Sequence, residues 1–189
     1  MNVSQMLQWL QETGVAIQIR DSLYAFPLLE SVHVVGLALV FGCIAILDLR
    51  LLGVASTNRS VSRILSDLLK WTWAAFALTA ATGALMFITN AVVYFHNTFF
   101  RAKMILLVLA ALNMLVFELT ARKTLRRWDE APAVPPTSAK VVATLSLIIW
   151  VGVIVAGRVI GFTATRAQAP TETQPDVNFE ELLGLPDAK

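Results

Sequence analysis

Long apolar runs separated by short polar stretches dominate the pattern of this chain. The clearest run extends from Ala25 to Leu52, and between Val34 and Leu47 its only ionisable side chain is Cys43. About twenty apolar residues are enough for a helix to cross the hydrocarbon core of a bilayer. By this criterion the pattern predicts four membrane-spanning helices, at about 25–52, 71–95, 102–121 and 141–163.

Amphipathic and polar segments flank these runs. Residues 1–22 are amphipathic, and a short helix over Ser4–Thr13 with Ser4 as its N-cap is expected to lie along the membrane surface. A second amphipathic stretch, 61–70, is expected to form a surface helix that leads into the second span. The short connection between the second and third spans predicts that these helices are antiparallel neighbours. The polar segment 165–189 is expected to be a flexible acidic tail.

The predicted fold class is therefore all-α: an integral membrane, up-down-up-down four-helix bundle over residues 23–164. Composition agrees, because 57% of the 189 residues are hydrophobic, 15% are charged and the mean hydropathy is +0.67. The net charge of +2, with basic residues clustered beside apolar runs, favours a lipid bilayer and excludes nucleic acid as the partner. The single cysteine excludes an intramolecular disulfide.

Basic residues also predict the orientation in the membrane. Positively charged residues in short loops stay on the cytoplasmic side. Most of them lie in or beside the first and third loops: Arg50, Arg59, Arg63, Lys70, Arg122, Lys123, Arg126, Arg127 and Lys140. We therefore expect a multi-pass protein of the bacterial inner membrane with both termini in the periplasm.

The first span carries a polar stripe. Glu30, His33 and Asp48 lie on one side of the helix, at 100° per residue. A titratable group within hydrocarbon costs roughly 2.5–3.5 kcal/mol on insertion scales, so this stripe is expected to face the bundle interior. The predicted orientation places most polar residues of the spans in the outer half: Glu30, His33, Asn90, His96, Asn97, Lys103 and Arg158. Polar groups at one depth predict a binding site.

Two histidines and two cations suit a haem b. His33 would be the main axial ligand, His96 a candidate second one, and Arg158 and Lys103 counter-charges for the propionates. At 1.5 Å per residue, His96 lies about 8–10 Å from the depth of His33, which counts against a simple bis-histidine pair. Helix tilt, an irregular end of the second span, or ligation by His33 alone would remove the mismatch. A copper or zinc ion held by His33, His96 and Glu30 is the alternative.

Each candidate also has a structural interpretation. His33 would then only hydrogen-bond to a neighbouring helix, and His96 would be an ordinary interfacial histidine. Arg158 would extend to the headgroups or pair with Glu30 across the bundle. No nucleophile with a base, phosphate loop or pair of carboxylates is present, so the sequence leaves open whether the protein is an enzyme.

Several motifs carry a family resemblance. They are Pro27-x-x-Glu30-x-x-His33, Asp48-Leu-Arg-Leu-Leu-Gly53, Gly83-Ala-Leu-Met-Phe87, Phe100-Arg-Ala-Lys103 and Ala156-Gly-Arg158. Over about residues 9–162 the chain resembles an uncharacterised family of small four-helix bacterial membrane proteins, which implies no established activity. It is loosely similar to the membrane domains of copper-resistance D proteins and of b-type cytochromes, which implies a metal or a haem. Family members can carry a histidine beside the phenylalanine of the third span. Here Glu118 follows Phe117, which weakens the haem interpretation.

These observations lead to three functional hypotheses. The first is a haem b- or metal-binding electron-transfer subunit that exchanges electrons with a quinone or a periplasmic redox protein. The second is a small transporter or channel for a proton, metal ion or anion, lined by Glu30, His33 and Arg158. The third is a structural subunit of a membrane complex, working with a partner subunit or as a homo-oligomer.

Overall fold

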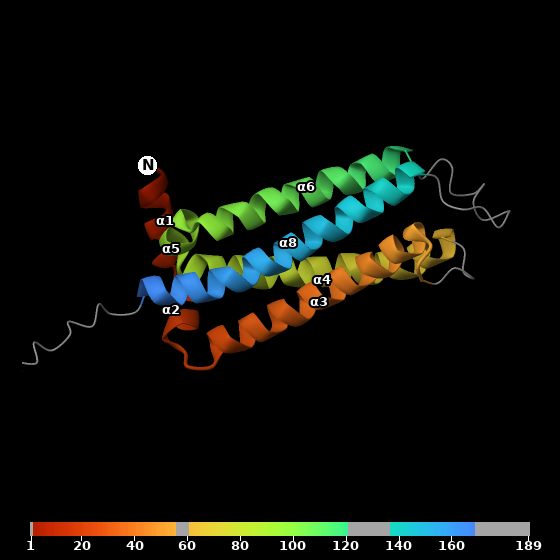
Figure 1. Ribbon diagram of the computed structural model, residues 1–189. Coiled ribbons are helices and arrows are strands. Elements are labelled where there is room, and N and C mark those ends of the chain that lie inside the picture. The colour runs from red at the N-terminus through yellow and green to blue at the C-terminus, as the bar shows by residue number, and fades with distance from the viewer. Residues whose placement is uncertain (1, 56–60, 121–136, 169–189) are drawn as a thin grey trace, which may run out of the picture.

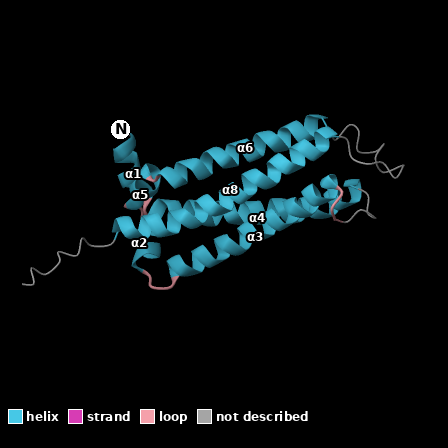
Figure 2. Cartoon of the chain, viewed as in Figure 1, coloured by secondary structure: helices cyan, strands magenta, loops and turns pink. Residues whose placement is uncertain are grey.

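The computed structural model describes residues 2–55, 61–120 and 137–168 (Figure 1). These residues contain helices and no strand (Figure 2), and four of the helices are long and apolar enough to cross a membrane. The predictions of an all-α fold and of four membrane-competent helices are therefore confirmed. Most of the basic third loop and of the acidic tail, residues 121–136 and 169–189, lies outside the described part.

Four long helices and three short ones make up the described chain. The long helices are α3 (Ala25–Leu52), α4 (Val61–Thr89), α6 (Thr98–Thr120) and α8 (Thr137–Gln168). The short helices are α1 (Val3–Gln11), α2 (Gly14–Asp21) and α5 (Ala91–His96). α3 ends at Gly53, whose φ of 78° is the left-handed conformation that terminates many helices.

The short helices gather at one end of the bundle, with the start of α3 and the end of α8 (Figure 1). We call this end the α1 end and the opposite one the far end. The predicted N-cap of α1 at Ser4 is wrong, because Asn2 has this role. The Asn2 side chain accepts from the Gln5 backbone N–H, and the Gln5 side chain accepts from the Asn2 N–H, each at 3.0 Å.

The second predicted span differs from the structure at both of its ends. Val61 to Lys70 is the first part of α4 rather than a separate surface helix. At the other end the helix is interrupted at Asn90, whose φ and ψ of −142° and 44° are not helical. Thr89 and Asn90 favour such a break, because both have low helix propensity and their side chains bond locally. The Thr89 hydroxyl donates to the Met86 carbonyl at 2.7 Å.

This interruption changes how the long helices pair. In the described residues the backbones of α4 and α3 lie close together, as do those of α6 and α8, whereas α4 and α6 meet only through side chains such as Phe87 and Phe100. The predicted second and third spans therefore do touch, through these side chains and through α5, but their closest backbone partners are α3 and α8. The connection includes α5, which packs against α1, α4, α6 and α8 and separates the end of α4 from the start of α6.

The lipid-facing and interior sides differ in the size of their side chains. Exposed positions of the long helices carry Leu, Val, Ile, Phe and Trp, whereas many buried positions carry Ala, Gly, Thr or Ser. Small interior residues allow helix backbones to approach closely, which is the usual basis of helix packing in membranes. The larger apolar side chains then remain available to lipid.

Candidate functional site

His33 points from α3 toward α4. Its Nδ1 lies 3.0 Å from the Thr79 carbonyl oxygen and 3.1 Å from the Thr82 hydroxyl. A carbonyl oxygen only accepts hydrogen bonds, so Nδ1 carries the proton and donates it. The Thr82 hydroxyl gives its own proton to the Leu78 carbonyl at 2.8 Å, which leaves its lone pairs free to accept. In the neutral ring, Nε2 is therefore the atom with a free lone pair.

Glycine makes room for this ring. A Cβ built at Gly83 would lie 2.9 Å from Cε1 and 3.3 Å from Nδ1 of His33. On α3, Gly36 lies three residues nearer the far end than His33. A Cβ at Gly36 would lie 2.5 Å from the Thr79 hydroxyl oxygen. These two glycines let α3 and α4 approach closely enough for His33 to reach the α4 backbone.

Lys103 extends from α6 toward α8. Its Nζ lies 3.6 Å from the position that a Cβ would take at Gly157. The side chain is half-buried, and its ammonium forms no ion pair or hydrogen bond with the described residues. It lies within electrostatic range of the His33 ring. We call His33, Thr79, Thr82 and Lys103 the histidine layer.

An aromatic cluster covers the histidine layer toward the α1 end. Phe87, one turn beyond Gly83, stacks on Phe100 with ring centroids 5.4 Å apart. Phe100, one turn before Lys103, also stacks on Tyr94 of α5 at 5.9 Å. These rings and the buried Ile160 separate the layer from the surface of the α1 end.

Glu30 lies at this end as well, but its side chain is exposed. Burial raises the pKa of the Tyr94 phenol, and the Glu30 carboxylate raises it further. Glu30 is thus close enough to act electrostatically on α5. Glu30 and Arg158 form no ion pair in the part of the chain that the structure describes.

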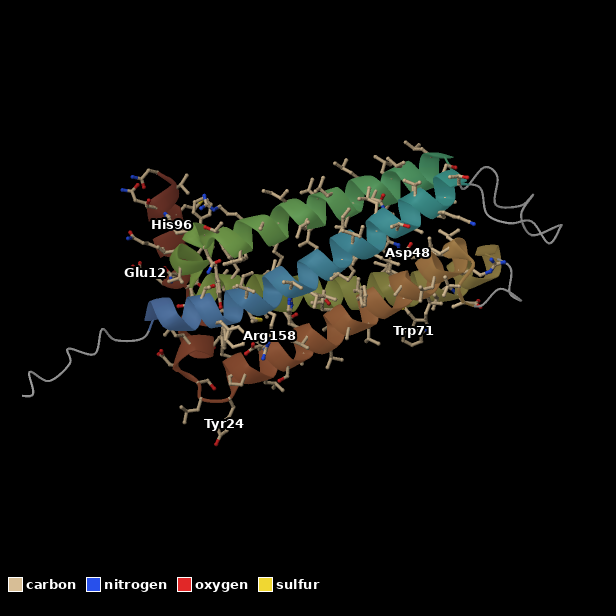
Figure 3. The ribbon with its side chains drawn as sticks, viewed as in Figure 1. Glu12, Tyr24, Asp48, Trp71, His96 and Arg158 are labelled. Atoms are coloured by element: carbon tan, nitrogen blue, oxygen red, sulfur yellow. The ribbon has the colours of Figure 1, made fainter. Side chains whose placement is uncertain are left out.

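The structure does not bring His96 to His33. His96 is exposed at the α1 end of the molecule (Figure 3), and its Nδ1 lies 2.9 Å from the Val92 carbonyl of its own helix. Its ring meets Phe95 edge to face, with centroids 5.5 Å apart. Because α5 is a separate short helix, the direction of this histidine is independent of the face that α4 presents to the interior.

Arg158 is also exposed. Its guanidinium lies 5.1 Å from the centre of the Phe162 ring, one turn farther along α8. This arrangement matches a side chain that runs along the helix surface toward the headgroups. Within the described residues, no three His, Cys, Asp or Glu side chains are grouped closely enough to hold a metal ion. Glu30, His33 and His96 therefore do not form a ready metal site in this structure.

A second polar group lies toward the far end (Figure 3) and was not expected as a site from the sequence. Asp48 of α3 is 5% exposed and hydrogen-bonds to Ser146 of α8. Asn113 of α6 donates to the Val142 carbonyl, one turn from Ser146, at 3.2 Å. We call Asp48, Asn113 and Ser146 the aspartate layer.

An apolar layer separates these two polar layers. It consists of Val40, Ala75, Trp150 and Val153, each at most 7% exposed, with the partly buried Leu37, Phe41, Ile44, Leu106, Leu107 and Ala110 around them. At 1.5 Å per residue, His33 and Asp48 lie about 22 Å apart along α3. Each layer is therefore a separate site candidate.

The sequence contained a signal for part of the histidine layer. Thr79, Thr82 and Gly83 follow the three- and four-residue spacing of one helix face, which indicates an interior surface with small and hydroxyl residues. It could not show that this face meets His33. Likewise Asn113 and Asp48 stood out as polar residues within spans, but Ser146 did not.

Comparisons with known proteins give a family without an assigned role. No curated protein and no solved structure matches the chain. Residues 12–163, which contain all four long helices apart from the last five residues of α8, match a family of unknown function, DUF6644. The match covers well over half of the sequence, and the chain therefore belongs to this family of unknown function.

Proposed function

We propose that this protein is a membrane electron-transfer subunit that holds a haem b, or failing that a copper ion, in its histidine layer; a zinc ion, which has no redox chemistry, would have only a structural role there. The observation that carries the proposal is the state of His33. Its Nδ1–H is bonded to a backbone carbonyl at 3.0 Å, and its Nε2 makes no hydrogen bond with the described residues. This is the arrangement of metal-binding histidines, in which a bond at one nitrogen orients the ring for ligation through the other.

Lys103 supports an anionic or acidic ligand. An ammonium within a membrane is unfavourable unless it has a partner, and Lys103 has none among the described residues. A carboxylate such as a haem propionate would provide that partner. The neighbouring aromatic side chains Phe87, Phe100 and Tyr94 would keep water away from the layer.

The side chains of the histidine layer offer one ligand and one counter-charge for a haem or metal ion. His96 and Arg158 are exposed, so we assign the role of ligand to His33 alone and the role of counter-charge to Lys103. When bound, a haem or copper ion supplies reversible one-electron chemistry. The chain itself would orient the ligand nitrogen through Thr79, exclude water and balance the charge. The loose similarity to copper-resistance D proteins and b-type cytochromes remains a prediction.

The transport hypothesis receives less support. A conducting path along the bundle would have to pass the apolar layer, in which Val40 and Val153 are 2% and 0% exposed. The buried residues at this depth, Val40, Ala75, Trp150 and Val153, form one apolar cluster. A site confined to the α1 end agrees better with this arrangement than a continuous route.

The proposal includes a membrane context. We propose an up-down-up-down bundle in a bacterial inner membrane, with both termini and the histidine layer on the periplasmic side. A quinone or a periplasmic redox protein would donate electrons to it, and a partner subunit would receive them. The basic residues of the first and third loops support this orientation.

The test is an absorption spectrum of the detergent-purified protein, air-oxidised and dithionite-reduced, together with its metal content. A Soret band that shifts on reduction in the wild type and disappears in His33→Ala is the expected result. His96→Ala is the matched control, because it removes an exposed histidine and should leave the band in place. A wild-type protein with no visible band and no stoichiometric metal would overturn the proposal.

Lys103→Met provides a further test. A nearby cation stabilises the reduced form of a redox group, because reduction adds negative charge. We therefore expect Lys103→Met to lower the midpoint potential in a spectroelectrochemical titration. Arg101→Met removes an exposed cation two residues away and serves as the control. Equal potentials in wild type and Lys103→Met would show that Lys103 is not the counter-charge.

A further inference from the structure

The aspartate layer holds a carboxyl group that the proposed electron-transfer site does not use. One oxygen of Asp48 shares a hydrogen bond with Ser146. The other, Oδ2, is buried and has no hydrogen-bond partner. Buried polar atoms without partners are rare in proteins, and one on a carboxyl group indicates that something is missing from it.

No charged group in the described residues compensates an ionised Asp48. On α4, which packs on α3, Asp67 and Lys70 are exposed, and on α8 Lys140 lies more than a turn before Ser146. Arg50 is two residues away on the same helix, a spacing at which side chains do not face each other. The remaining neighbours are apolar: Leu51, Phe117, Ala139 and Ala143 form a buried cluster at the far end. The side chain of Glu118 on α6 is outside the described part.

We propose that Asp48 is a proton-binding site, in which Oδ2 takes one proton from the aqueous phase at the far end while Ser146 holds the other oxygen. Proton uptake converts the carboxylate into a neutral carboxylic acid and removes the negative charge from the apolar surroundings. The described surroundings suit a proton better than a metal ion. Ser146 and Asn113 offer one further oxygen each, whereas Ca²⁺ and Mg²⁺ need at least six oxygen ligands.

The position of Asp48 determines which aqueous phase supplies the proton. Asp48 lies four residues before the end of α3, about 6 Å along the helix axis. The apolar layer lies between it and the α1 end. Protons therefore exchange with the aqueous phase at the far end, which is the nearer one. This inference is independent of any cofactor at His33.

Infrared spectroscopy of the full-length protein in lipid tests the proposal directly. A protonated carboxyl group has a carbonyl band that is separate from the amide bands and shifts when its proton is exchanged for deuterium. We expect this band in the wild type, with a shift after equilibration in D2O, and its loss in Asp48→Asn. Glu30→Gln is the matched control, because it removes an exposed carboxyl from the same helix and should leave the band unchanged.

Ser146→Ala keeps the test decisive if Asp48→Asn does not fold. Loss of the hydrogen bond to the carboxyl oxygen should move the band to higher frequency without removing it. Absence of the band from mildly acidic to mildly alkaline buffer would overturn the proposal. A band that does not respond to D2O, or that is identical in Asp48→Asn, would also overturn it, since the first indicates an inert group and the second a different carboxyl.

Discussion

At the scale of single residues, the bond between His33 and the Thr79 carbonyl determines what the imidazole can do. A carbonyl that would normally serve only its own helix also accepts from Nδ1, and this selects one tautomer of the neutral ring. A histidine with the opposite tautomer would present an N–H to the interior and could not act as a ligand. The chemistry of the layer thus depends on one backbone oxygen of a neighbouring helix.

The space for that ring gives the first prediction. Gly83→Ala would place a Cβ 2.9 Å from Cε1 of His33, so the ring must move. We expect unfolding in mixed micelles to become easier by roughly 1–3 kcal/mol, as is typical of overpacked interiors. If the layer holds a haem, its Soret band should also shift or weaken.

Gly42→Ala provides the comparison for this substitution. It lies on α3, and a Cβ at this position has nothing within 4 Å. It should therefore leave both stability and spectrum nearly unchanged. If Gly83→Ala and Gly42→Ala behave alike, the ring is not seated against Gly83.

At the scale of the elements, the close approach of α3 and α4 depends on Gly36. A Cβ there would lie 2.5 Å from the Thr79 hydroxyl oxygen, which itself donates to the Ala75 carbonyl at 2.7 Å. We expect Gly36→Ala to destabilise the protein by roughly 1–3 kcal/mol in unfolding titrations. Thr79→Ala removes the clashing oxygen, so the double variant should recover part of the loss. No recovery would place the strain elsewhere.

Asn97 joins two other elements. Its side-chain oxygen accepts from the backbone N–H groups of Phe99 and Phe100 at 2.9 and 3.2 Å, and its Nδ2 donates to the Thr163 hydroxyl of α8 at 2.8 Å. Asn97→Ala should lower the free energy of unfolding by roughly 1–2 kcal/mol, the sum of a lost N-cap and an interhelical bond. Thr163→Val removes only the bond to α8 and should have the smaller effect. An equal effect of both variants would show that the cap contributes nothing.

The pairing of the elements also shows the limit of prediction from sequence. The apolar pattern located four membrane-competent helices, because the thickness of the bilayer sets the length of each run. It did not reveal the interruption at Asn90, since Thr89 and Asn90 fit the end of a long span as well as a break within one. A pattern of single helices contains no information on which helix packs on which, so the pairing of α6 with α8 could not be deduced.

At the scale of the whole molecule, the orientation in the membrane can be measured. With Cys43 replaced by alanine, Gln5→Cys on α1 and Ser138→Cys near the start of α8 place single thiols at opposite ends of the bundle. Both positions are exposed. We expect an impermeant maleimide added to whole cells with a permeabilised outer membrane to label Gln5→Cys only. Ser138→Cys should react only after the inner membrane is opened, and the reverse pattern would contradict the proposed orientation.

The sequence by itself determined that this protein is helical and suited to a membrane, and it identified the ionisable residues within the spans. Those properties follow from hydrophobic length and from the energetic penalty of charge in hydrocarbon, which act on each helix separately. Only the tertiary structure decided which of these residues meet. It placed His33 against Thr79, Lys103 beside Gly157, and Asp48 with Ser146, while His96 and Arg158 remained exposed. The physical reason is that the rotation and pairing of helices depend on close contacts of small residues such as Gly36 and Gly83, which no single helix specifies.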